Sequence, residues 1–183
     1  KVLNKGLVEF AGNATLNKDI GTVANAPASV TFADTPNVVQ TLNTDNIFAT
    51  NILLRQGAVN LNKNISLTGS TTASNTSIAL NDKKLTVANG NLLAFSGNNN
   101  ITLDVAVNGT VVTGGGQIVS LGTLEFAAGT TIKVAPNSGV AGLVGGATIK
   151  TSVITSATVV AAGKTLDLSK VDVKTPDTFT KWT

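Results

Sequence analysis

One phrase recurs along this chain. A large apolar residue is followed six positions later by an aliphatic one, across a short stretch of small and turn-forming residues. Such recurrence is typical of repeat architectures, because one unit cannot bury its apolar face until the next unit stacks on it. The phrase therefore predicts a scaffold of strand, turn and strand units. The six copies run from Phe10 to Leu16, Phe32 to Val38, Phe48 to Leu54, Phe95 to Ile101, Phe126 to Ile132 and Val160 to Leu166.

Short segments with apolar side chains at every second position recur between polar or glycine-rich corners, which is the pattern of half-buried strands. No window carries apolar positions at helical spacing for three turns, so an all-β chain is predicted. The predicted strands are residues 30–32, 59–61, 65–67, 85–87, 101–107, 132–134, 149–153 and 166–168. The predicted corners, where Asn and Gly allow the backbone to bend, include residues 62–64, 81–84, 98–100, 114–117 and 163–165.

Two topologies fit these strands. In a parallel β-helix, or β-solenoid, of irregular short coils, equivalent positions stack about 4.8 Å apart. In an antiparallel β-sandwich, neighbouring segments pair as hairpins, and Asn89-Gly90 and Asn108-Gly109 are hairpin signals. The strands of a sandwich lie in different environments and have no reason to repeat one phrase. The β-helix is therefore the preferred prediction, with an interior ladder formed by Phe10, Phe32, Phe48, Phe95 and Phe126.

The domain prediction places the β-solenoid over residues 1–171 and a C-terminal tail or cap over residues 172–183. The tail breaks the pattern with Pro176 and contains the single tryptophan, Trp182. Residues 68–77 and 138–146 are the most irregular stretches. We expect them to leave the coil as loops, which is where function usually resides on a solenoid.

The composition excludes the commonest catalytic arrangements. The chain has no His and no Cys, which excludes Ser-His-Asp and Cys-His arrangements. Gly163-Lys164-Thr165 is similar to the end of a phosphate-binding loop, but Thr158 stands where that motif needs glycine, so we expect no nucleotide. The aspartates are isolated from one another and from the glycine-rich turns, which gives no support for a calcium site. We therefore assign no catalytic, cofactor-binding or metal-ligating residue and expect no cofactor.

Two carboxylates, Glu9 and Glu125, occupy the same position of their units, immediately before Phe10 and Phe126. Both would point outward if the phenylalanines point inward. In a solenoid they would lie several coils apart, far beyond the separation that glycosidases use, so we expect no enzyme activity. The net charge of +3 is scattered along the chain without a basic face or stacking aromatics, so we expect no nucleic-acid partner.

Three phrases, FAGNATLN from Phe10, LAFSGNNNIT from Leu93 and TLEFAAGTTIKV from Thr123, carry a family resemblance. They resemble the recurring units of bacterial autotransporter passenger domains, and most of all the rickettsial surface-antigen autotransporters, including the outer membrane protein B type. The resemblance covers roughly residues 1–170. It implies a β-helical passenger, exported across the outer membrane by a C-terminal translocator barrel, that acts at the bacterial cell surface or is released from it.

On this basis we expect a fragment of a surface-displayed passenger that acts as a non-catalytic adhesin or in host-cell invasion. Its partner would be a host-cell surface protein or the extracellular matrix, and its only membrane attachment would be the translocator barrel outside this sequence. Two alternatives stay open: a polysaccharide-binding or depolymerising β-helix, and a structural spacer of a surface protein. No residue can be assigned to the partner contact from the sequence.

Overall fold

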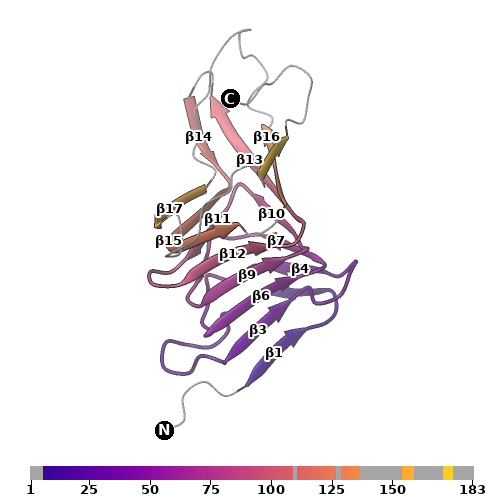
Figure 1. The fold of residues 1–183 in the computed structure, drawn as a ribbon, viewed down its shortest axis with the longest axis vertical. Helices are drawn as coiled ribbons and strands as arrows, with labels where there is room; N and C mark the ends of the chain where they lie inside the picture. The colour runs from indigo at the N-terminus through magenta and orange to yellow at the C-terminus, as the bar shows by residue number, and fades with distance from the viewer. Residues whose placement is uncertain (1–5, 109–110, 127–128, 137–153, 159–170, 175–183) are drawn as a thin grey trace.

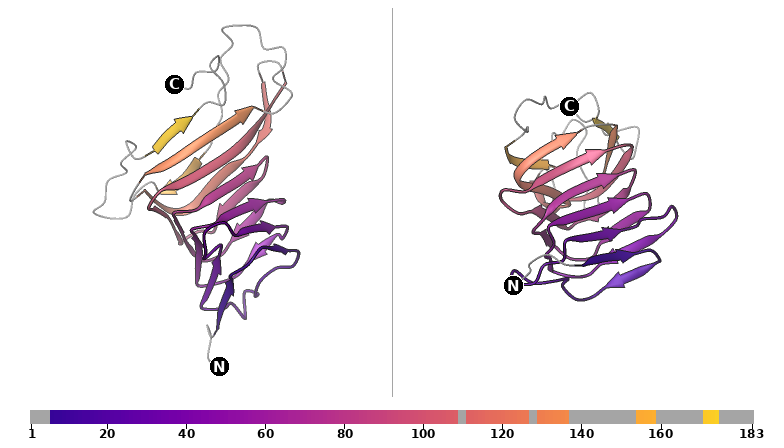
Figure 2. Two further views of the ribbon diagram at one scale, coloured as in Figure 1. Left: turned by 90° about the vertical axis from the view of Figure 1, so that its right-hand side faces the viewer. Right: turned by 60° about the horizontal axis from the view of Figure 1, so that its bottom comes forward.

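The computed structural model describes residues 6–108, 111–126, 129–136, 154–158 and 171–174. Its regular structure is all β, without a helix in these residues, and it forms a β-solenoid with parallel sheets (Figures 1 and 2). The predicted parallel β-helix is confirmed and the antiparallel sandwich is wrong. Parallel stacking follows because each coil returns its chain to the same place, one interstrand spacing further along the axis.

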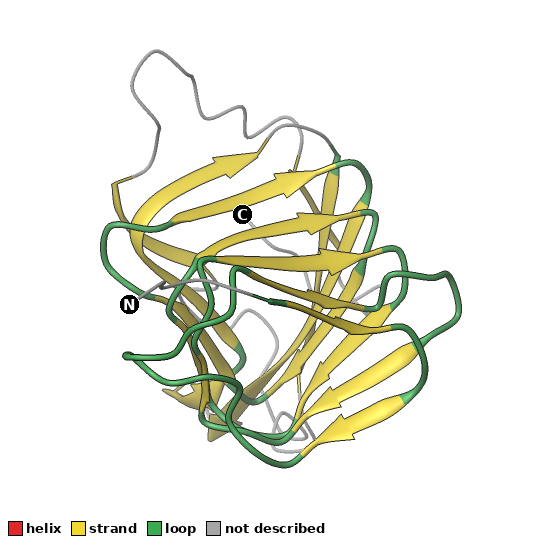
Figure 3. Ribbon diagram, turned by 90° about the horizontal axis from the view of Figure 1, so that it is seen from below, coloured by secondary structure: helices red, strands yellow, loops and turns green. Residues whose placement is uncertain are grey.

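The strands stack on three faces, and Figure 3 shows them surrounding the interior. The first face stacks β1 (Leu7–Phe10), β3 (Ser29–Phe32), β6 (Asn51–Arg55), β9 (Ser70–Ser74), β12 (Leu92–Ser96) and the second half of β15 (Gln117–Phe126). The second face stacks β2 (Ala14–Leu16), β4 (Val39–Leu42), β7 (Ala58–Leu61), β10 (Ser77–Asn81), β13 (Asn99–Asn108), β16 (Thr130–Pro136) and β18 (Val171–Lys174). The third face stacks β5 (Asn46–Ile47), β8 (Ile65–Leu67), β11 (Lys84–Val87), the first half of β15 and β17 (Ile154–Thr158).

The interior ladder exists on the first face, with a different membership from the prediction. Phe10, Phe32 and Phe95 share one column, in which Leu54 and Ala73 fill the two rungs between Phe32 and Phe95. The rings of Phe10 and Phe32 stack with centroids 5.1 Å apart and planes 3° apart. Phe126 continues the column in backbone register with Phe95, and its side chain lies outside the described part.

Phe48 does not belong to the ladder, so this part of the prediction is wrong. It lies half-buried in the corner between β5 and β6, where its N–H donates to the carbonyl of Ile20 at 2.8 Å. The six-residue step from Phe48 to Leu54 runs from a corner into a strand. It has the same spacing as the step from Phe10 to Leu16 but a different structure, because the latter connects two strands on different faces.

Six of the eight predicted strands coincide with strands of the solenoid, namely those at residues 30–32, 59–61, 65–67, 85–87, 101–107 and 132–134. The predictions at residues 149–153 and 166–168, and the loop at residues 138–146, lie outside the described residues. The strand β18 lies across the predicted boundary between residues 171 and 172, in register with β16.

The predicted loop at residues 68–77 is instead the regular strand β9 with its flanking corners. Thr71 and Ala73 point inward and are completely buried, in register with Ile52 and Leu54 of the coil below. The buried hydroxyl of Thr71 donates to the carbonyl of Gly69 at 3.1 Å. The prediction failed because Ser, Thr and Ala alternate in direction here without alternating in hydrophobicity.

The two hairpin signals have different outcomes. Asn108-Gly109 marks a true antiparallel pair, since β13 pairs with β14 (Val111–Gly115), and this hairpin is an insertion into one coil. Asn89-Gly90 lies at a corner between the third and first faces, where Gly90 has a φ of 78°. The strands on either side, β11 and β12, pair with strands of other coils and not with each other, so the second hairpin is wrong.

Polar corner side chains connect successive coils. We call Asn13, Asp19, Asn64 and Asn75 the corner acceptors. Each uses its side-chain Oδ1 to accept a backbone N–H from the next coil, at 2.8 Å from Val39, 3.0 Å from Asn46, 2.9 Å from Lys84 and 2.9 Å from Asn98, respectively. The sequence indicated Asn only as a turn former, but these residues also satisfy donors at the corners, where the ladder of strand hydrogen bonds is interrupted.

Asp19 is the charged member of this group. The hydroxyl of Thr44, the side chain of Asn46 and the backbone N–H groups of Asn46 and Asp45 all donate to its carboxylate. These hydrogen bonds, that from Thr44 foremost, lower the pKa of Asp19 from 3.8 to about 2, because they favour the ionised form.

Candidate functional site

The outer surface of the first face consists mainly of small polar side chains. Alternate residues of β6, β9 and β12 point outward, opposite the buried columns. Arg55, Ser74 and Ser96 form one outward column, since Arg55 pairs with Ser74 and Ser74 pairs with Ser96. Side-chain size therefore falls from a long arginine to two serines across three adjacent coils, which leaves a recess in the surface.

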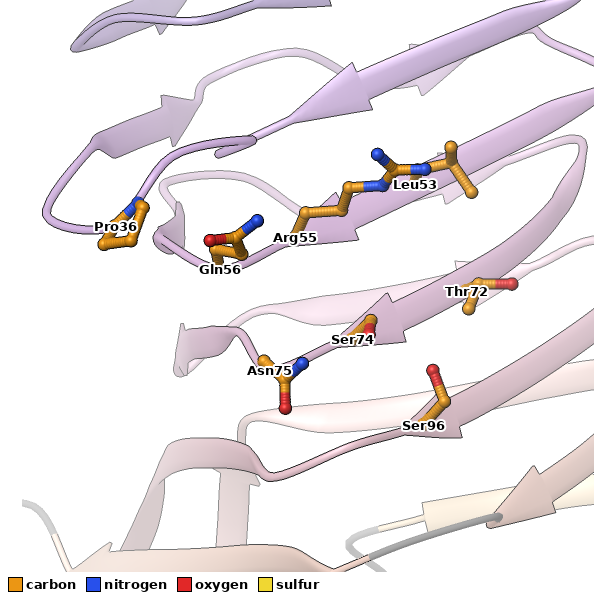
Figure 4. A pocket seen from close by; sticks show the side chains of 8 residues that line it. All are labelled: Pro36, Leu53, Arg55, Gln56, Thr72, Ser74, Asn75 and Ser96. Atoms are coloured by element: carbon orange, nitrogen blue, oxygen red, sulfur yellow. The ribbon is translucent and has the colours of Figure 1, made fainter.

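This recess is a hollow of about 680 Å³ on the outside of the solenoid (Figure 4). Ligand sites usually have volumes of a few hundred to about 1,000 Å³, so the hollow is large enough for a small-molecule-sized group. Its position was not predicted from the sequence, which gave no site residue. The lining residues are Pro36, Leu53, Arg55, Gln56, Thr72, Ser74, Asn75 and Ser96.

The corners shape one end of the hollow. Pro36 belongs to the segment between β3 and β4, whereas Gln56 and Asn75 form the short corners after β6 and β9. Gln56 has a φ of 32° and Asn75 a φ of 53°, so both adopt the left-handed region that allows a tight bend. These bends present the two amide side chains at the end of the outward column.

Arg55 is the one charged residue in the described lining of the hollow. Its Nη1 lies 3.2 Å from Oδ1 of Asp34, with 48% of the Arg55 side chain and 28% of the Asp34 side chain exposed. Such an exposed pair contributes little to stability. The ion pair compensates the charge of Arg55 beside the hollow. The other guanidinium N–H groups of Arg55 and Oδ2 of Asp34 stay available to a ligand.

The other polar side chains in the hollow can both donate and accept hydrogen bonds. The hydroxyls of Thr72, Ser74 and Ser96 do so with one atom, and the amides of Gln56 and Asn75 do so with two. Asn75 already uses Oδ1 as a corner acceptor. Leu53 and Pro36 add a small apolar area to this otherwise polar lining.

The structure places Glu9 and Glu125 in one outward column of the first face, as predicted. Thr31, Leu53, Thr72 and Ala94 occupy the four rungs between them. Five interstrand steps of about 4.8 Å separate the two backbones by about 24 Å. Two glycosidase carboxylates lie within about 10 Å of each other, so this pair cannot share one glycosidic bond.

Three further features concern metal, nucleotide and membrane binding. The part of the chain that the structure describes contains no group of three or more His, Cys, Asp or Glu residues that could hold a metal ion. Gly163-Lys164-Thr165 lies outside the described residues. In the described ranges, no helix has the length and hydropathy needed to cross a membrane.

Comparison with known proteins gives no relative from which a role could be transferred. No protein-family model, curated protein or solved structure matches the chain.

Proposed function

We propose that this chain is a non-catalytic binding segment of a surface-displayed bacterial protein, acting as an adhesin or host-cell interaction module. The hollow on the first face is the observation that supports this proposal most strongly. Its side chains come from three successive coils and are held by strands whose backbones pair in register. A ligand would therefore meet a preformed surface and pay little ordering entropy on the protein side.

The chemistry of the lining favours binding over catalysis. General acid or base catalysis needs a side chain that exchanges a proton near the working pH. A guanidinium does not exchange its proton in proteins, and the lining residues other than Arg55 are amides, hydroxyls and apolar groups. Such groups can hold and orient a partner without transferring a proton.

Display at the bacterial surface rests on the resemblance of the repeated phrases to autotransporter passenger domains. The β-solenoid agrees with the architecture which that resemblance implies. The partner would be a host-cell surface protein or a component of the extracellular matrix, which a stiff segment could contact through the hollow on one side. Attachment to the membrane would then come from a translocator barrel elsewhere in the parent protein.

The test is binding of the labelled chain to cultured host cells and to matrix-coated surfaces. We expect saturable binding that unlabelled chain displaces, with heat-denatured protein as the control. Absence of saturable binding to either surface would contradict the adhesin role and favour a structural spacer. Incubation with a polysaccharide panel gives a second readout, since release of reducing ends would identify a depolymerase.

A further inference from the structure

We propose that the hollow on the first face binds a neutral oligosaccharide. This inference rests on the proposed function as a binding segment and names the chemical class of its ligand. A neutral sugar presents many hydroxyls, each of which donates and accepts a hydrogen bond. A matching site therefore needs closely spaced groups that do both, together with a small apolar area for the C–H face of the ring.

The polar side chains in the hollow meet the first requirement. Within the described residues, the side chains of Gln56, Thr72, Ser74 and Ser96 make no hydrogen bond to the rest of the protein, so their capacity is available to a ligand. They come from three adjacent coils, with rungs about 4.8 Å apart. Leu53 and Pro36 supply the apolar area beside them.

The charge beside the hollow selects a neutral ligand over an anionic one. An acidic sugar would need an uncompensated cation, but Asp34 pairs with Arg55 at 3.2 Å. The pair places a strong donor next to a strong acceptor. Two neighbouring hydroxyls of one sugar ring can use such a pair, one accepting from the guanidinium and the other donating to the carboxylate.

The position of the hollow argues against an extended peptide as the ligand. Peptides that join a sheet pair with the free backbone groups of an edge strand. The hollow instead lies on the outer surface of β6, β9 and β12, whose backbones already pair with neighbours on both sides. Recognition there depends on side chains, and the side chains are those that suit a sugar.

The direct test titrates the whole chain with neutral oligosaccharides, namely gluco-, manno- and galacto-oligosaccharides, and with heparin and polygalacturonate as anionic probes. We expect saturable binding of at least one neutral probe, measured by calorimetry or by NMR shifts.

Ser74→Tyr fills the hollow and should weaken that binding by about tenfold or more. Ser66→Tyr is the matched control, because Ser66 points outward from β8 on the third face. Unchanged circular dichroism and urea midpoint will establish that both variants fold.

A second variant tests the charge argument. Asp34→Asn leaves the cation of Arg55 uncompensated, so affinity for the neutral probe should fall and affinity for heparin should rise. Binding of the neutral probe should also change little with salt, because screening acts on charged partners. The proposal is overturned if no neutral probe binds, if only the anionic probes bind, or if Ser74→Tyr has no more effect than Ser66→Tyr.

Cell binding separates this proposal from the proposed function. Glycosidase-treated cells and surfaces coated with free polysaccharide distinguish a cell-surface glycan from a polysaccharide source. If cells bind the chain while the oligosaccharides do not, the adhesin role stands and the sugar hypothesis fails. If an oligosaccharide binds in the hollow while cells do not, the hollow is a sugar site and the host-cell role fails.

Discussion

The first coil and the central coils of this solenoid use the same interior columns, but they bury them to different extents. Phe10 of β1 is half-buried, whereas Phe95 of β12 is completely buried in the same column. The difference lies in the neighbours, because β12 pairs on both sides and β1 pairs only with β3 among the described residues. Burial in this fold is therefore a property of the stack, as nearest-neighbour models of repeat proteins assume.

The corners of the two regions differ in the same way. A Cβ added to Gly69, between β8 and β9, would lie 2.1 Å from the carbonyl oxygen of Ala49 in the adjacent coil. A Cβ added to Gly12, in the first coil, would meet nothing within 4 Å. Close coil-to-coil contact thus demands glycine at one corner and leaves the other free to vary.

The sharpest test of this comparison removes one ring from each region. Phe95→Ala should lower the free energy of unfolding by about 3–5 kcal/mol, the usual cost of deleting a buried ring and leaving a cavity. Phe10→Ala should cost less than half of that, because the half-buried ring loses less apolar contact. Urea denaturation followed by circular dichroism measures both values. Equal losses would show that the first coil is as well covered as the centre.

The corner comparison predicts a smaller difference. Gly69→Ala should destabilise by about 1–3 kcal/mol, as overpacking does, because the atom it meets is backbone and cannot rotate away. Gly12→Ala is the control and should be neutral within measurement error. A tolerated Gly69→Ala would mean that the two coils separate more easily than their hydrogen bonds indicate.

The junction between the first and second coils is open to a third test. Gln40 is buried in the column of Val59 and Ile78, where it donates to the carbonyls of Phe10 and Gly12 and accepts from the N–H of Ala33 at 2.8 Å. Gln40→Ile places an apolar side chain in this apolar column but leaves the N–H of Ala33 without its acceptor. We therefore expect the free energy of unfolding to fall by about 1–2 kcal/mol. Amide exchange measured by NMR should show the loss first in β1 and β2. The outward substitution Thr41→Ile, which keeps these bonds, should leave that exchange unchanged.

The smallest expected effect is the acid response of the corner acceptor Asp19. Its pKa is about 2 in the folded chain against 3.8 ordinarily, so its contribution to stability is complete above about pH 4 and is lost as the pH falls through 2. The exposure of this carboxylate keeps the effect modest. The amide signals of Asp45 and Asn46 should titrate in that range, and Asp19→Asn should remove the titration. An unchanged titration in the variant would assign it to another group.

Sequence reasoning succeeded where hydrophobicity alternates and failed where it does not. The strand at Ile65 and Leu67 was predictable because its inward side chains are apolar and its outward ones are polar. The strand β9 was not, since Thr71 and Ala73 are inward residues too small or too polar to stand out. Phe48 failed for the opposite reason, because a conspicuous residue at the right spacing lies in a corner.

The hollow was beyond prediction because it depends on register between coils. The ladder positions Phe10, Phe32, Leu54, Ala73 and Phe95 follow at intervals of 22, 22, 19 and 22 residues. Unless these unequal intervals are known, nothing in the sequence places Arg55 in one column with Ser74 and Ser96. The ion pair between Arg55 and Asp34 could not be predicted from the sequence either, because it joins one coil to the corner of another.

The corner acceptors give this rod a direction. In all four, the oxygen belongs to the earlier winding and the N–H to the winding that follows. If the chain folds from its N-terminal end, each of these oxygens is already in position when the next winding forms. Growth from the N-terminal end can then proceed on a finished template at these four corners, whereas the N–H of Thr76 awaits the following winding, where Oδ1 of Asn99 accepts it at 3.2 Å.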